Sequence, residues 1–149
     1  MSDTARLILT VAVLSASATA MFAWRVSRLD PSEPDRLVGE LRLAQWAALL
    51  LATGAGSWVG LAVANDAVPV GTIEVTFGVV FVLLAALILT REPRDGLLFA
   101  AAAFVAHALI DIAHRPGLLS PDLVPRWYAV GCAIFDVFIA AVCYWTRRR

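Results

Sequence analysis

The sequence contains no lysine, and charged residues of every kind make up only 16% of its 149 positions. Its twelve basic residues are all arginines, and they are scattered along the chain rather than gathered in one basic tract. Proteins that bind nucleic acids usually carry such a tract, so the sequence predicts no nucleic-acid partner.

Cysteine and histidine are also scarce, with two of each. Cys132 and Cys143 are eleven residues apart in one apolar run, so a helix would separate them by roughly 16 Å, beyond the reach of a disulfide. The chain has no Cys-x-x-Cys pair, glycine-rich phosphate loop or Gly-x-Ser-x-Gly elbow. These absences exclude thiol redox, nucleotide-loop and serine-hydrolase chemistry of the familiar kinds.

Apolar residues are abundant instead: they make up 60% of the chain, and the mean hydropathy is +0.79. A soluble domain of this length could not bury so much apolar surface. Only helices and closed barrels satisfy their backbone groups in lipid, and about 20 apolar residues let a helix cross it. We therefore predict an all-α polytopic membrane protein, a five-helix antiparallel bundle forming a single transmembrane domain over 1–149. The apolar stretches are 7–24, 43–64, 68–90, 97–113 and 127–146.

The arginines are divided unequally between the two sides of such a bundle. Nine fall on the side of the first connecting loop and the C-terminus, and three fall on the other. Because cytoplasmic loops carry an excess of arginine, we expect the N-terminus outside and the C-terminus in the cytoplasm. The predicted location is the bacterial cytoplasmic (inner) membrane, with multiple passes. The nine are Arg25, Arg28, Arg36, Arg42, Arg91, Arg94, Arg147, Arg148 and Arg149, and the three are Arg6, Arg115 and Arg126.

The first connecting segment has a helical pattern of its own. Ser32 can cap a helix over 33–42, in which Arg36 and Glu40 are four residues apart on a polar face opposite an apolar one. We interpret 33–42 as an interfacial helix leading into the second membrane helix. An ordinary polar loop is the alternative.

A stripe of small residues follows in the second membrane helix. Gly56 and Gly60 form a Gly-x-x-x-Gly motif, which lets another helix backbone approach closely. The partner is either another helix of the bundle or a neighbouring chain, and we expect internal packing.

Ionisable side chains inside lipid are costly, roughly 2.5–3.5 kcal/mol each at mid-helix, so each needs a reason. Three acids qualify, Glu74, Asp111 and Asp136, together with the two histidines, His107 and His114. The i, i+4, i+7 spacing places His107, Asp111 and His114 on one face of the fourth predicted helix. If the fourth and fifth helices turn these faces toward each other, the polar groups meet in the extracytoplasmic half.

Two functional interpretations fit this set. Imidazole and carboxylate groups can hold a divalent metal ion, with His107, Asp111 and His114 as ligands. Alternatively, His107, Asp111, Asp136 and Glu74 form a ligand or proton site. The competing interpretation is structural: a His107–Asp136 hydrogen bond that fixes helix register, Glu74 at a helix N-terminus and His114 at the water boundary.

The same region resembles a group of small bacterial polytopic membrane proteins whose function is not known. The similarity lies in AHALIDIAHR at 106–115, VPRWY at 124–128 and CAIFD at 132–136. It implies a His-x-x-x-Asp-x-x-His segment and a buried aspartate in the last helix, but no activity. The chain departs from the group at Ile110, where a tryptophan is expected, and at Arg115, where a histidine is expected.

The functional hypothesis is an extracytoplasmic-side His/Asp site that binds a metal ion or a small lipid-soluble ligand, with proton transfer as an associated activity. A non-catalytic accessory subunit of a larger membrane complex is the first alternative, and a small oligomeric transporter is the second. The expected partners are the lipid bilayer and either other membrane subunits or further copies of the chain. The sequence assigns no catalytic residue.

Overall fold

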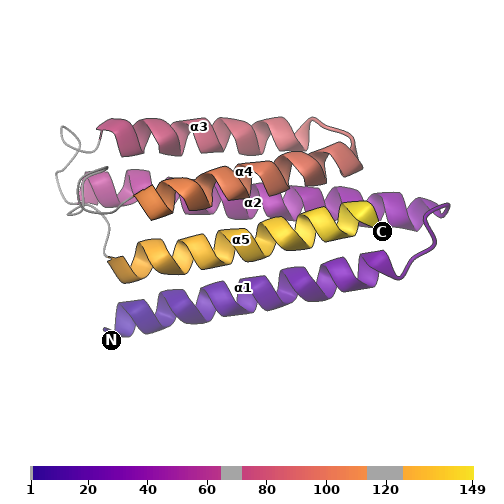
Figure 1. Cartoon of the computed structure of the whole chain (residues 1–149), viewed down its shortest axis with the longest axis horizontal. Helices are drawn as coiled ribbons and strands as arrows, with labels where there is room; N and C mark the ends of the chain where they lie inside the picture. The colour runs from indigo at the N-terminus through magenta and orange to yellow at the C-terminus, as the bar shows by residue number, and fades with distance from the viewer. Residues whose placement is uncertain (1, 65–71, 114–125) are drawn as a thin grey trace.

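The computed structural model describes residues 2–64, 72–113 and 126–149, and every regular element within them is an α-helix (Figure 1). The predicted all-α class is confirmed. Four of the described helices, α1, α2, α4 and α5, are long and apolar enough to cross a membrane, whereas α3 is an apolar helix of 18 residues. The bounds are α1 Asp3–Ser27, α2 Pro34–Ala64, α3 Thr72–Leu89, α4 Pro93–Ala113 and α5 Arg126–Arg148.

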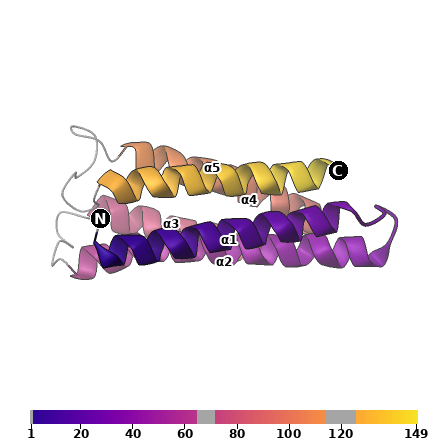
Figure 2. The same cartoon turned by 90° about the horizontal axis from the view of Figure 1, so that it is seen from below.

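The five helices lie side by side and alternate in direction, so the two termini are at opposite ends of the bundle (Figures 1 and 2). Within the described residues, α2 contacts all four other helices, while α1 contacts α2 and α5, and α3 contacts α2 and α4. The end of α4 and the start of α5 therefore lie at the same end as the start of α3 (Figure 1). The predicted connections at 65–67 and 115–125 are outside the described residues.

The core between these helices is built mainly from small side chains. Ala47 and Ala55 on α2 and Ala100 on α4 are fully buried, and Leu51 and Phe104 belong to the same buried cluster. Small residues let helix backbones approach closely, which is the usual basis of packing where lipid provides no hydrophobic driving force between helices. This packing places α2 close enough to α3 and α4 for side chains from all three to share one site.

The segment 33–42 is helical from Pro34 and leads directly into the second membrane helix, as predicted, but it is not a separate helix. Pro34–Ala64 is one unbroken helix of 31 residues, ~46 Å long, so this segment forms its first turns. Its faces are also reversed: Leu37 and Val38 are exposed, whereas Arg36 and Glu40 are buried. Arg36 and Glu40 can be buried because the guanidinium and the carboxylate form an ion pair.

The expectation that Gly56 and Gly60 pack inside the bundle is also wrong. A Cβ atom added at either position would meet no described atom within 4 Å, so the motif lies on the outside of α2. The close approach of α2 and α3 is made at Gly78 instead, where a Cβ would lie 3.0 Å from the carbonyl oxygen of Ala55. The second option, contact with a neighbouring chain, stays a prediction.

Candidate functional site

A buried histidine and two buried aspartates meet between α4 and α5. His107 Nδ1 lies 2.7 Å from Asp136 Oδ2, across the helix pair, and 3.4 Å from Asp111 Oδ2, one turn along α4. This short hydrogen bond joins Nδ1 to Asp136 Oδ2, and Nδ1 is its donor in the forms of the imidazole that carry a proton on that nitrogen. The predicted meeting of His107 and Asp136 is confirmed.

The three residues offer a compact set of ligand atoms. One nitrogen or oxygen from each of His107, Asp111 and Asp136 lies within 4.8 Å of the others. The side chains are almost completely shielded, with 2%, 2% and 4% of each residue exposed respectively. A set so small and so enclosed suits an ion or a proton better than an organic molecule.

Two aromatic rings hold the imidazole in place. The indole of Trp58, on α2, stacks on His107 with 4.5 Å between ring centroids and 18° between planes. The ring of Phe81, on α3, meets the imidazole edge to face at 4.8 Å and 70°. Gly54 lies opposite the remaining edge, since a Cβ there would be 3.9 Å from His107 Nε2. Four helices therefore define one imidazole orientation.

The cluster contains buried polar atoms without hydrogen-bond partners among the described residues. These are both carboxylate oxygens of Asp111 and Nε2 of His107. Buried carboxylates are normally satisfied by donors, because an unsatisfied one keeps its full desolvation cost. Two carboxylates also exceed the single positive charge that an imidazolium could supply. The site is therefore short of positive charge and of donors.

Hydroxyl and thiol groups lie beside the cluster at the same end of the bundle. Tyr128 donates a hydrogen bond to Ser57 Oγ at 2.6 Å, and Ser57 in turn donates to the carbonyl of Gly54 at 2.6 Å. Cys132 lies one turn after Tyr128 and one turn before Asp136 on α5. These groups connect the start of α5 to the part of α2 that faces the imidazole.

Two further residues were predicted for the site, Glu74 and His114. Glu74 is buried in the first turn of α3, at the same end of the bundle, but supplies no ligand atom to the compact set. His114, the third predicted metal ligand, lies outside the described residues. Among the described residues, Asp136 supplies the third ligand atom of the cluster.

Sequence reasoning missed the aromatic cover of Trp58 and Phe81, and it missed a second buried charged cluster. At the opposite end of the bundle, Glu40 binds Arg36 Nε at 2.7 Å and Arg94 Nε at 3.2 Å. In the sequence, the only sign of the buried Arg36–Glu40 pair is its i, i+4 spacing. The same spacing is common for ion pairs on solvent-exposed helices, so it does not indicate burial.

Comparison with known proteins adds no relative: no protein-family model, curated protein or solved structure matches the chain. The resemblance to small bacterial membrane proteins described above therefore stays a prediction. Any function must be argued from the geometry of the site.

Proposed function

We propose that this chain is a multi-pass membrane protein that binds a divalent metal ion, with Zn²⁺ as the first candidate, through His107, Asp111 and Asp136. The observation that carries the proposal is the Asp111 carboxylate, which is buried against a second acid while both its oxygens lack hydrogen-bond partners in the described chain. A bound dication would satisfy those oxygens and balance the two negative charges.

The donor set supports this choice of ion. One imidazole nitrogen and two carboxylate oxygens are ligands that Zn²⁺ accepts, and three protein ligands leave a coordination position for water or another molecule. Binding through Nδ1 requires this nitrogen to lose its proton, so the affinity should fall as the pH is lowered. The bound ion would supply either a structural link between α4 and α5 or Lewis acidity.

The bundle's arginines support an extracytoplasmic position for the site in the bacterial inner membrane. Nine of the twelve lie at or near the ends formed by Ser27, Pro34, Pro93 and Arg148, which is the end opposite the cluster. Positively charged ends face the cytoplasm in most membrane proteins, so the cluster belongs to the other half of the bilayer. It is also part of this proposal that all five helices, including α3, cross the membrane.

Proton binding is the second candidate function, and the 2.7 Å contact between His107 Nδ1 and Asp136 Oδ2 favours it. That distance is typical of a charge-assisted hydrogen bond. In this version the same three groups pass protons to or from a lipid-soluble ligand, or carry the proton that a larger assembly transports. The transporter hypothesis belongs to this version, whereas in a non-catalytic accessory subunit the cluster only fixes the contact between α4 and α5.

Metal analysis of the purified full chain in detergent separates the candidates. After chelator treatment and incubation with Zn²⁺, we expect a stoichiometric amount of retained zinc and a higher unfolding temperature than in chelator. The variants His107→Ala and Asp136→Asn should lose both effects while keeping the helical circular dichroism spectrum. Glu74→Gln is the matched control, because it removes a buried acid at the same end of the bundle without touching the cluster.

Zinc retention that survives His107→Ala, or that disappears equally in Glu74→Gln, would refute the metal site. If the wild-type chain retains no metal, the proton candidate is tested in vesicles with a pH gradient. Proton leak that depends on His107 would then support it, and stable co-purifying membrane proteins without such a leak would favour the accessory subunit.

A further inference from the structure

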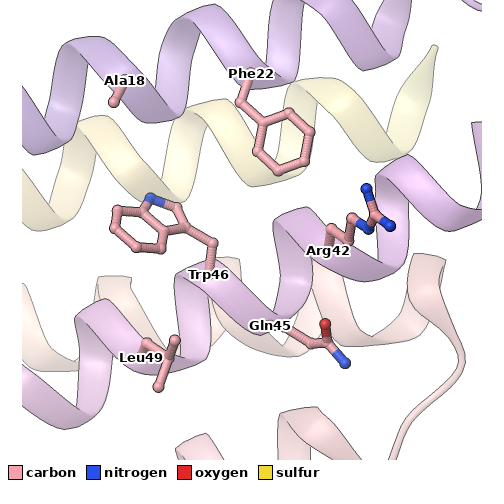
Figure 3. A pocket seen from close by; sticks show the side chains of 6 residues that line it. All are labelled: Ala18, Phe22, Arg42, Gln45, Trp46 and Leu49. Carbon is pink, nitrogen blue, oxygen red and sulfur yellow. The ribbon is translucent and has the colours of Figure 1, made fainter.

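A groove on the outer surface of the bundle runs between α1 and α2, away from the metal cluster. It has a volume of about 400 Å³ and lies open toward the surroundings of the bundle. The side chains that line it are Ala18 and Phe22 from α1, and Arg42, Gln45, Trp46 and Leu49 from α2. Figure 3 shows Ala18 and Phe22 pointing from α1 toward Trp46 and Arg42 of α2, with Gln45 and Leu49 along the α2 side of the groove.

The groove has a polar end and an apolar end. Arg42 and Gln45 are nearer the start of α2 than Leu49 is (Figure 3). Leu49 follows Arg42 by seven residues, which is ~10 Å by helix rise. Trp46 lies between the polar end and the apolar end. Its indole is held in place because the N–H donates a hydrogen bond to Thr19 Oγ1 on α1 at 2.8 Å. The groove therefore has the amphipathic profile of a lipid: a polar group at the arginine-rich end and hydrocarbon beyond it.

The charge of Arg42 is uncompensated within the described chain. No ion pair or hydrogen bond joins its guanidinium to a described residue, whereas Arg36 and Arg94 both bind Glu40. Other arginines at this end have aromatic partners: Arg91, for example, lies over the ring of Phe99 at 5.1 Å. A cation beside hydrocarbon is costly unless an anion accompanies it.

We propose that this groove binds an anionic glycerophospholipid, with its phosphate on Arg42 and Gln45 and one acyl chain along Phe22, Trp46 and Leu49. A guanidinium presents paired N–H donors that match phosphate oxygens. Zwitterionic lipids carry the same phosphate, but their own cation cancels the net charge, so the anionic class should be preferred. Basic grooves at the cytoplasmic side of membrane helices commonly recognise such headgroups.

Native mass spectrometry of the full-length protein tests this proposal. The probe is an equal mixture of phosphatidylglycerol and phosphatidylcholine with identical acyl chains, added to the detergent-purified chain. We expect phosphatidylglycerol to be retained about fivefold more than phosphatidylcholine, as expected for one favourable arginine–anion contact. Arg42→Gln should abolish this preference. Arg91→Gln, which removes an arginine at the same end but outside the groove, should leave it unchanged.

A second variant tests the apolar part separately. Ala18 is exposed, so Ala18→Phe should fill the groove without disturbing the core, and it should reduce retention of both lipids while Arg42 stays in place. Glycerol phosphate, which lacks acyl chains, should not be retained. Equal retention of the two lipids, equal loss in Arg42→Gln and Arg91→Gln, or occupation by a neutral lipid or a second copy of the chain would overturn the proposal.

Discussion

Arg36 and Glu40 form an ion pair inside the protein, with 2.7 Å between Nε and Oε1 and at most 1% of either residue exposed. The same guanidinium donates to the carbonyl of Val26 at 2.7 Å and to that of Thr146 at 3.1 Å. These carbonyls belong to the last turns of α1 and α5, where each also accepts a backbone N–H, from Leu29 and Arg149 respectively. One side chain therefore ties three helix ends together.

Removing Glu40 should be far more damaging than removing its outer partner. Glu40→Gln leaves Arg36 buried without a counter-charge, which costs about 3–5 kcal/mol of the free energy of unfolding. Arg94→Gln should cost less than about 1 kcal/mol, because the Arg94 side chain is 52% exposed and solvent screens its pair. Reversible unfolding in detergent micelles measures both values. Equal losses would mean that Arg36 is satisfied by helix carbonyls alone.

Asp111 should show the opposite behaviour, in which loss of function accompanies a gain in stability. Asp111→Asn removes one of two adjacent buried carboxylates and supplies N–H donors, so the metal-free protein should gain about 1 kcal/mol. The same variant should lose zinc retention. Asp136→Asn serves as the comparison, since Asp136 accepts the 2.7 Å hydrogen bond and its loss should bring no gain. Unfolding in chelator provides the measurement, and a destabilised Asp111→Asn would assign that carboxylate a structural role.

Trp58 should act as a positioning residue for the imidazole. Its ring is stacked on His107 and completely buried, so Trp58→Leu frees the imidazole to rotate away from the two carboxylates. Residues that orient metal ligands typically change affinity by about 10–100-fold, and we expect a loss near the lower end. Trp58→Phe retains a stacking ring and should restore most of the affinity. Competition with a zinc chelator measures the affinity, and an unchanged value in Trp58→Leu would contradict the role.

The bundle and the shared face of His107 and Asp111 could be predicted because both depend on local pattern. The lengths of the apolar runs define helices, and the i, i+4 spacing of His107 and Asp111 fixes their shared face before any tertiary contact forms. Short connections then make neighbouring helices adjacent and antiparallel. These arguments need no knowledge of how a helix is rotated about its own axis.

The features that depend on rotation could not be predicted. Nothing in the local pattern tells which face of α2 turns inward, so Trp58 was not connected to His107, and Arg36 and Glu40 were assigned to the polar surface. In a soluble protein, the apolar face of a helix indicates which side turns inward. In lipid this indication is lost, because apolar residues are suited to both the core and the outside of the bundle. The position of Gly56 and Gly60 was misjudged for the same reason.

The glycines of α2 and α3 provide a direct test of that rotation. A Cβ at Gly78 would lie 2.8 Å from Val59 Cγ2 and 3.0 Å from the backbone oxygen of Ala55. Gly78→Ala should therefore push α3 away from α2 and cost about 1–3 kcal/mol, as overpacking of a tight contact does. Gly60→Ala is the matched control, because its Cβ would meet open space among the described residues. It should be neutral or slightly stabilising, since alanine favours the helix more than glycine. Unfolding in monomeric detergent micelles gives both values, and a larger loss for Gly60→Ala would show that the Gly56–Gly60 face, rather than Gly78, makes the tight contact within the bundle.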